Sequence, residues 1–175
     1  MDIVFANAGI GSYLALDKIT EEHFDATFNT NVKGTLFTVQ AVLPILSDGA
    51  SVILNTSITA DLGLPDFSVY AAAKAALRSF VHSWATDLKH RRVRVNAISP
   101  GGIPTEAATG ELGRTPEQER QHQQRVAGFV PLGRVGTTHE IGEAVAFLAS
   151  EQSSYVNGIE LTVDGGMTAV FAGTL

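Results

Sequence analysis

Val93-Arg-Val-Asn-Ala-Ile98, followed by Ser99-Pro-Gly-Gly102, is the stretch that decides the fold. Its length and apolar content are typical of a buried strand, and the Pro-Gly-Gly after it ends that strand. Similar short apolar runs occur at residues 3–6, 51–54 and 159–163. Because helical patterns lie between these runs, the chain alternates strands with helices. That alternation predicts an α/β fold with a parallel sheet and right-handed connections.

The helices are marked by periodicity and by capping signals. Apolar residues recur at three- or four-residue steps over residues 24–43, which predicts one helix over about residues 20–45. An alanine-rich helix is expected over about residues 68–90. Thr115 and Thr137 are each followed three residues later by Gln or Glu, a capping-box pattern that predicts a helix start at each position.

Composition limits the classes of protein to consider. The 175 residues suffice for one domain with its own core, and a content of 45% apolar residues excludes a disordered chain. The formal net charge of −6 disfavours nucleic acid or an anionic membrane as a partner. We interpret a local basic cluster, Lys89, Arg91, Arg92 and Arg94, as a solvated helix end. The absence of cysteine excludes disulfides, thiolate metal sites and cysteine nucleophiles, and the five histidines show no metal-ligand spacing.

The beginning of the chain raises one question. No signal peptide and no membrane-spanning stretch is visible, so we expect a soluble cytoplasmic protein. The first predicted strand, Ile-Val-Phe-Ala at residues 3–6, is apolar on both faces, as strands in the middle of a parallel sheet are. An exposed apolar edge invites pairing. We therefore expect either a truncated chain or a second chain that covers this edge.

Tyr70 and Lys74 carry the pattern that most directly indicates chemistry. They are four residues apart on a predicted helix, so they share a face with the apolar stripe that continues through Leu77 and Val81. A buried ammonium is costly without a partner, but beside a tyrosine it stabilises the phenolate and lowers the phenol pKa from about 10. Such a tyrosine can exchange a proton with an alcohol or a ketone near neutral pH.

Two further polar residues lie at places where ligands bind. Ser57 follows a predicted strand end, and its hydroxyl could donate a hydrogen bond to a substrate carbonyl oxygen. Asn31 interrupts a helical pattern and could hold a water or bind Lys74 through its side-chain oxygen. Each feature alone has a simpler interpretation: a Tyr-x-x-x-Lys spacing by chance, a serine that caps a loop, an asparagine at a kink.

Gly9-Ile-Gly11-Ser-Tyr-Leu14 begins like a dinucleotide-binding glycine motif. Leu14 stands where the third glycine belongs, and no helix begins at once. We therefore do not interpret this stretch as a phosphate loop.

Order and spacing together are more specific than any single motif. The combined set closely resembles the short-chain dehydrogenase/reductase family, with Ser57 thirteen residues before Tyr70 as the family pattern requires. The resemblance runs from Asp2 to about Met167 and rests on Asn7-Ala-Gly9, Asn31-Val-Lys-Gly34, Asn55-Thr-Ser57, Tyr70-Ala-Ala-Ala-Lys74, Arg94-Val-Asn-Ala-Ile-Ser-Pro-Gly101, Thr105 and Val163-Asp-Gly-Gly166.

The resemblance implies an NAD(P)-dependent oxidoreductase that transfers a hydride between nicotinamide and a carbonyl or secondary alcohol. Tyr70 would be the general acid/base, Lys74 would bind the nicotinamide ribose and lower the tyrosine pKa, Ser57 would orient the substrate oxygen, and Asn31 would support a proton-relay water. Further cofactor contacts are implied for Asn7, Ala8, Gly9, Pro100, Gly101, Ile103 and Thr105. The segment from about Glu106 to Phe129 would be the substrate lid.

The family's first strand, its glycine-rich turn and two further βα units have no counterpart in these residues. At about 30 residues per unit, roughly 70 to 90 residues are expected to be missing. The implied fold is therefore a truncated Rossmann-like parallel sheet of about four strands with flanking helices, one partial domain over residues 1–175, matching the C-terminal part of the family fold. The choice between NAD and NADP is not readable, and the truncated chain need not bind either. A homo-oligomer with a small-molecule substrate is implied. The alternative is a catalytically inactive fragment that acts as an oligomerisation or binding module.

Overall fold

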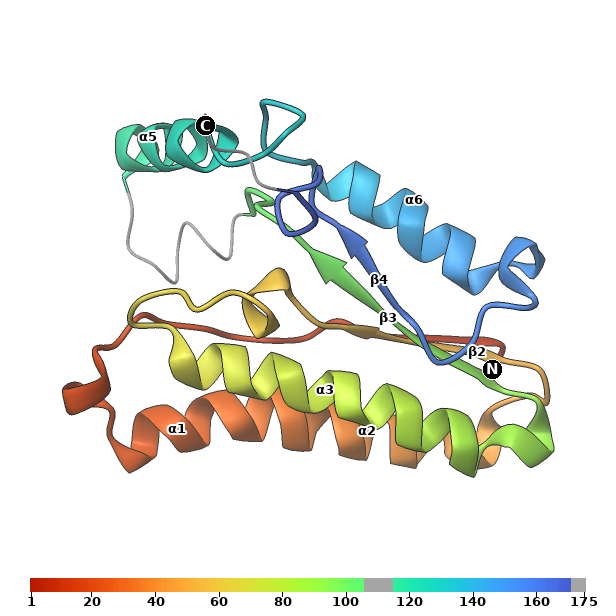
Figure 1. The fold of residues 1–175 in the computed structure, drawn as a ribbon. Helices are drawn as coiled ribbons and strands as arrows, with labels where there is room; N and C mark the ends of the chain where they lie inside the picture. The colour runs from red at the N-terminus through yellow and green to blue at the C-terminus, as the bar shows by residue number, and fades with distance from the viewer. Residues whose placement is uncertain (106–114, 171–175) are drawn as a thin grey trace.

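The structure, a computed structural model, describes residues 1–105 and 115–170. A four-stranded parallel sheet forms its centre, with strands in the order β1, β2, β3, β4 (Figure 1). The strands are β1 (Ile3–Ala6), β2 (Ser51–Asn55), β3 (Arg94–Pro100) and β4 (Glu160–Val163). The predicted fold class is confirmed, and each predicted strand differs from the observed one by at most two residues at either end.

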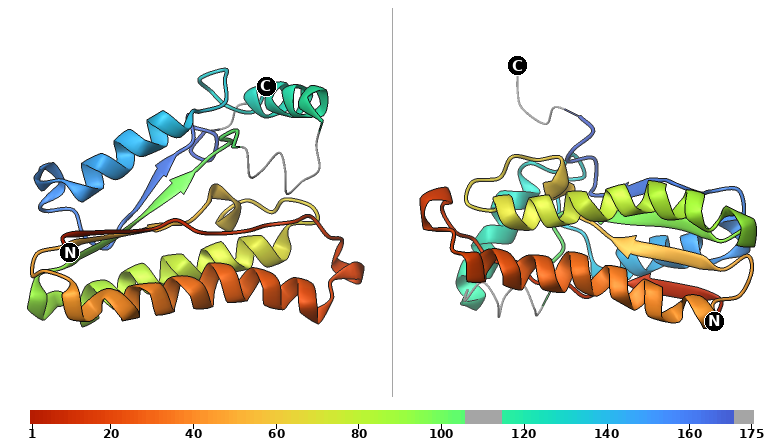
Figure 2. Two further views of the ribbon diagram at one scale, coloured as in Figure 1. Left: turned by 180° about the vertical axis from the view of Figure 1, so that it is seen from behind. Right: turned by 90° about the horizontal axis from the view of Figure 1, so that it is seen from below.

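Helices cover both faces of the sheet. On one face lie α1 (Glu21–Phe28), α2 (Thr35–Val42) and α3 (Ser68–Asp87), and on the other lies α6 (Thr138–Ala149), as two further views show (Figure 2). The helix α5 (Pro116–Ala127) lies beyond the C-terminal ends of the strands. Both predicted capping boxes are present, at Thr115 with Gln118 and at Thr137 with Glu140.

The core has two parts because β2 and β3 are covered on both faces. Val52 and Leu54 pack with Leu77 in the cluster between the sheet and α2 and α3. Ile53 packs with Leu148 in the smaller cluster beneath α6. Alternate residues of one strand thus serve opposite layers, which explains why β2 is a continuous apolar run.

The strand β1 lies at one edge of the sheet. Its inward residues Val4 and Ala6 are buried, whereas Ile3 and Phe5 are 50% and 38% exposed. The expectation of an exposed apolar strand at this edge is confirmed. Such an edge offers unpaired backbone groups to a further strand.

The helix predicted over residues 20–45 is not continuous. A π-helical turn, Asn29–Gly34, separates α1 from α2, and a 3₁₀ turn, Leu43–Ile45, follows at Pro44. This wider turn places the side chain of Asn31 against the loop after β1, where its amide binds the backbone of Ile10. π-turns of this kind often occur at functional sites. The alanine-rich helix is also shorter than predicted: α3 ends at Asp87, and a 3₁₀ turn occupies Lys89–Arg91.

The interpretation of the basic cluster as a solvated helix end is wrong for Arg94. Its side chain is buried and donates hydrogen bonds to the carbonyls of Leu148 and Ser150 and to Oγ of Ser153, at 2.9, 3.2 and 2.8 Å. These carbonyls lie at the C-terminal end of α6, where no intrahelical donor remains for them. Arg94 therefore fastens α6 to the sheet.

Candidate active site

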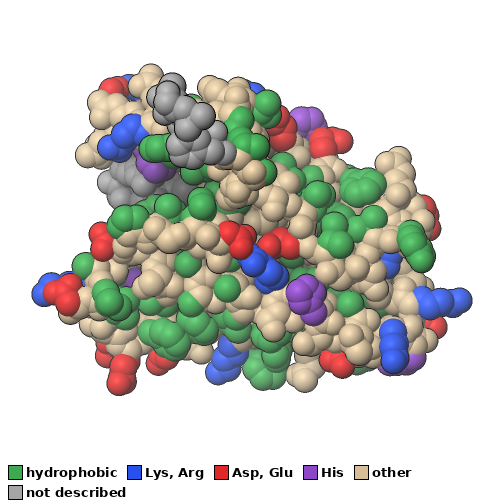
Figure 3. All heavy atoms as spheres, viewed as in Figure 1, with side chains coloured by type: hydrophobic (Ala, Val, Ile, Leu, Met, Phe, Trp, Pro, Cys, Tyr) green, Lys and Arg blue, Asp and Glu red, His purple; other side chains and the backbone are tan. Residues whose placement is uncertain are grey.

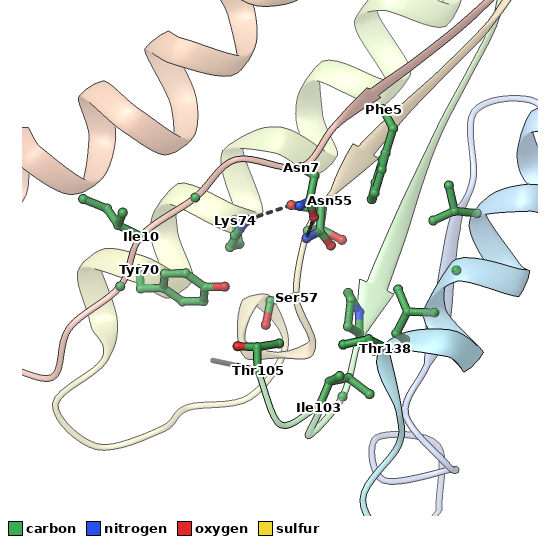
Figure 4. A pocket seen from close by; sticks show the side chains of 18 of the residues that line it. Phe5, Asn7, Ile10, Asn55, Ser57, Tyr70, Lys74, Ile103, Thr105 and Thr138 are labelled. Atoms are coloured by element: carbon green, nitrogen blue, oxygen red, sulfur yellow. Dashed lines mark hydrogen bonds between the residues drawn. The ribbon is translucent and has the colours of Figure 1, made fainter. Parts of the chain in front are cut away.

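A cavity of about 690 Å³ opens at the C-terminal ends of β1, β2 and β3 (Figure 4). This is the edge where open α/β sheets bind ligands, and the volume is within the range of small-molecule sites. Nine of the eleven residues singled out from the sequence line it: Asn7, Gly9, Ser57, Tyr70, Lys74, Pro100, Gly101, Ile103 and Thr105. Asn31 lies behind the cavity wall, and Ala8 is absent from the lining.

Lys74 is the largest fully buried side chain in the part of the chain that the structure describes, with 2% of its surface exposed. Its ammonium donates a hydrogen bond of 2.7 Å to the carbonyl of Asn55 and lies 5.5 Å from the centre of the Tyr70 ring. Burial lowers the pKa of Lys74 from 10.5 to about 8, because removal from water disfavours the charged form. The predicted buried stripe is confirmed, since Leu77 and Val81 on the same helix face are also buried.

Tyr70 and Ser57 reach the cavity from different elements. Tyr70 is in the first turn of α3, and its hydroxyl points toward the part of the cavity where Ser57 lies (Figure 4). Ser57 follows β2, and its oxygen accepts hydrogen bonds from the backbone N–H and the hydroxyl of Thr59. Both the capping role and the cavity position considered for Ser57 are therefore present. Because its oxygen accepts in both bonds, the Ser57 O–H can donate to a ligand.

Asn31 is fully buried, and both atoms of its amide are used. Its Oδ1 accepts from the N–H of Ile10 at 2.8 Å, and its Nδ2 donates to the Ile10 carbonyl at 2.9 Å. The suggestion that the side-chain oxygen binds Lys74 is wrong, because the ammonium of Lys74 donates to the carbonyl of Asn55 and not to Asn31. A role for Asn31 in holding a relay water stays a prediction.

The segments predicted to contact the cofactor are held tightly at the cavity edge. Asn7 accepts a hydrogen bond of 2.7 Å from the side chain of Asn55. Gly101 lies so close to Asp164 that an added Cβ would be 2.7 Å from the Asp164 Cα. The backbone after β3 can therefore follow its path only without a side chain at residue 101.

Several lining residues were not predicted. Asn55 joins two sides of the site, since its carbonyl binds Lys74 and its side chain binds Asn7. It stands inside a motif that was recognised, so the signal existed. The lining residues from α6 and β1, namely Phe5, Thr138, Ile141, Gly142 and Val145, carried no signal because they reach the cavity only through the tertiary fold. The predicted lid runs from about Glu106 to Phe129. Its residues 106–114 lie outside the described residues, and α5 forms most of the remainder.

Among residues 1–105 and 115–170, no three side chains of His, Cys, Asp or Glu are placed to hold a metal ion. In that portion no helix has the length and apolar content to cross a membrane.

Comparison with known proteins agrees with the geometry. A family profile described as enoyl-(acyl carrier protein) reductase matches residues 1–168. The oxidoreductase asL5 of Sarocladium schorii is 43% identical over 172 residues, which cover 97% of this chain and 67% of that protein. The chain belongs to the short-chain dehydrogenase/reductase family. The hydroxynaphthalene reductase-like protein Arp2 of Metarhizium brunneum is 36% identical and covers 95% of this chain and 65% of its own length.

Solved structures of other proteins show the same arrangement. The angucycline C-6 ketoreductase LanV, solved with bound NADP, superposes with a TM-score of 0.85 at 30% identity, over 95% of this chain and 62% of its own. A short-chain dehydrogenase family protein from Francisella tularensis gives a TM-score of 0.87 at 28% identity, over 97% and 72%. The chain thus spans about two thirds of the length of the family members it matches.

Proposed function

We propose that this chain carries the hydride-transfer site of an NAD(P)-dependent oxidoreductase that interconverts a carbonyl compound and a secondary alcohol. The observation that carries the proposal is the meeting of Tyr70, Lys74 and Ser57 in one cavity at the C-terminal edge of the sheet. Family membership and the reductase names of the relatives support the reaction class.

The residues around the cavity fit the nicotinamide half of the cofactor. The ammonium of Lys74 has three N–H donors, and the carbonyl of Asn55 is its one hydrogen-bond acceptor among the described residues. Ribose hydroxyls are suitable further acceptors. Asn7, Gly9 and Pro100 border the same space, as do Gly101, Ile103 and Thr105, and Ala8 belongs to the same turn. Because LanV was solved with NADP, we expect NADP(H) to be the better ligand of the two.

Each catalytic side chain then has one task. A nicotinamide cofactor held by these residues would supply the hydride in the reducing direction and accept it in the other. Tyr70 donates its phenolic proton to the substrate oxygen as that oxygen gains charge, or removes it from the alcohol. Ser57 donates a hydrogen bond to the same oxygen, which stabilises the developing negative charge. Lys74 favours the tyrosinate by its charge, and Asn31 supports a relay water that returns the proton to solvent.

A binding titration tests the proposal before any substrate is known. NADH and NADPH are titrated into the purified chain while the fluorescence of the reduced nicotinamide is followed. We expect saturable binding that Lys74→Ala abolishes. Lys18→Ala is the matched control, because the Lys18 side chain is 69% exposed and far more accessible than that of Lys74. Absence of binding at millimolar cofactor would contradict the proposal for the isolated chain.

A second candidate function is an oligomerisation or binding module without catalysis. The exposed apolar residues Ile3 and Phe5 on β1 favour it, as do Phe24 and Phe37, which are 43% and 51% exposed. Figure 3 shows hydrophobic side chains gathered over the side formed by α1, α2 and α3. This candidate predicts a native mass above that of one chain, measured by light scattering during size-exclusion chromatography. A stable monomer at micromolar concentration would contradict it.

A further inference from the structure

The loop after β1 lies along the helix face that carries Tyr70 and Lys74. An added Cβ at Gly9 would lie 3.2 Å from Nζ of Lys74. The backbone of Ile10 is then fixed at both its N–H and its carbonyl by the amide of Asn31. Two hydrogen bonds to a buried side chain leave the loop little freedom at this point, so the next residue is held in a defined place.

That next residue is Gly11, and it faces the ring of Tyr70. An added Cβ would be 2.5 Å from Cδ2 of Tyr70, 3.0 Å from Cε2 and 3.1 Å from Cγ. Side-chain carbons do not approach one another so closely, so any side chain at residue 11 requires the phenol ring or the loop to move. The backbone at Gly11 is therefore in direct packing contact with the ring, and the position requires glycine for reasons of space.

Phe67 contacts the same ring from the turn before α3. Its ring stacks on Tyr70 with centroids 4.5 Å apart and planes inclined by 27°, and Tyr13 stacks on Phe67 at 4.3 Å and 21°. The loop and the turn also bind each other directly, because the N–H of Leu14 donates to the carbonyl of Asp66 at 2.7 Å. Three aromatic rings thus form one row that ends on Tyr70.

The start of α3 lacks a side-chain cap. Phe67 is the N-cap residue, and no side chain caps the helix there. Uncapped helix starts fray because their first N–H groups lack partners. Tyr70 is in this first turn, so the packing of its ring contributes to its position. A general acid/base must stay within hydrogen-bond reach of the reacting oxygen, and a displacement of about 1 Å can lower the rate by about 100-fold.

We propose that Gly11 and Phe67 are positioning residues for Tyr70, which together hold its phenol ring at a fixed distance from Lys74 and Ser57, with Tyr13 supporting Phe67. This inference rests on the proposed function only in the role it gives to Tyr70. It assigns a purpose to Gly11 that is unrelated to phosphate binding. It also predicts that the aromatic row affects proton transfer through the position of the Tyr70 ring, in the cavity that Gly11 and Phe67 also line.

The test is a pH titration of tyrosinate absorbance, which does not need a substrate. The chain has three tyrosines, and Tyr13→Phe with Tyr155→Phe leaves Tyr70 as the single reporter while keeping a ring at residue 13. In this background, Gly11→Ala and Phe67→Leu each displace or release the Tyr70 ring. We expect each to shift the apparent pKa of Tyr70 by about half a unit or more, because the ring leaves its fixed position relative to Lys74 and Ser57.

Two matched variants separate positioning from general loosening. Gly63→Ala makes the same change where an added Cβ meets nothing within 4 Å. Phe24→Leu removes a ring that stacks on Phe28 within α1, at a centroid distance of 4.2 Å. Neither should move the Tyr70 titration. Circular dichroism identifies any variant that fails to fold, and since Gly11 and Phe67 lie on different segments, either one alone decides the question.

An unchanged titration in a folded Gly11→Ala or Phe67→Leu chain would overturn the proposal, as would an equal shift in the two matched variants. NADPH binding is measured on the same samples. If the parent chain does not bind NADPH, that result counts against the proposed function. The Tyr70 titration would still decide the role of Gly11 and Phe67.

Discussion

Replacing Lys74 by methionine should stabilise this chain at neutral pH. The ammonium is 2% exposed, and burial lowers its pKa from 10.5 to about 8. At pH 7 the charged form therefore costs the folded state about 3 kcal/mol, at about 1.4 kcal/mol per pKa unit. Methionine has a similar length and no charge, but it leaves the carbonyl of Asn55 without its donor, which costs about 1–2 kcal/mol. The variant should thus be more stable by about 1–2 kcal/mol.

The pH dependence gives this prediction its sign. Between pH 8 and 10.5 the unfolded chain holds a proton on residue 74 that the folded chain has lost, so the stability of the parent rises with pH. The gain is about 2.5 kcal/mol between pH 7 and 10, and Lys74→Met lacks it. The advantage of the variant should therefore disappear near pH 10. Other titrating groups cancel in the difference between the two proteins.

Urea unfolding followed by circular dichroism measures both proteins at pH 7, 8, 9 and 10. Lys18→Met serves as the control, because the Lys18 side chain is 69% exposed and its removal should give a small difference that does not change with pH. A Lys74→Met chain that is less stable at pH 7 by an amount that stays constant to pH 10 would refute the reasoning. It would mean that the buried ammonium is fully compensated in the fold.

Four other changes have defined outcomes. Tyr70→Phe should lower kcat by about 100-fold or more while the NADPH dissociation constant stays within about twofold, measured by steady-state kinetics and fluorescence titration. Gly101→Ala should cost about 1–3 kcal/mol in urea unfolding, because its Cβ would meet the backbone of Asp164 at 2.7 Å. Gly142→Ala, inside α6 with nothing within 4 Å, should instead stabilise by about 0.5–1 kcal/mol. Asn31→Leu should cost about 2 kcal/mol, since two hydrogen bonds to the loop after β1 are lost.

Local patterns predicted those parts of the fold whose cause is local. The capping boxes at Thr115 and Thr137 each involve residues three apart, and both helices begin where these pairs predict. The shared face of Tyr70 and Lys74 follows from helical periodicity alone, and so does the burial of that face. Continuous apolar runs predicted the inner strands because both of their faces are covered.

The errors arise where a partner far along the chain decides the local structure. The π-turn that divides the helix predicted over residues 20–45 exists because Asn31 binds Ile10, which lies 21 residues earlier. Local propensity cannot register that contact, so the pattern indicated an unbroken helix. The same contact directs the Asn31 side chain to Ile10, whereas Lys74 binds the carbonyl of Asn55.

The two kinds of determinant meet at the ring of Tyr70. Its spacing from Lys74 is a property of one helix and is visible in five letters of sequence. Its placement depends on Gly11 and Phe67, and the pairing of the glycine with the tyrosine spans 59 positions that no periodicity connects. The stretch around Gly11 begins like a nucleotide motif, but Leu14 already excluded that interpretation and left the glycine unexplained. In the fold, Gly11 is explained by the ring of Tyr70, which leaves no room for a Cβ at residue 11. A match to a glycine motif should therefore be tested by asking which atoms a Cβ at that position would contact.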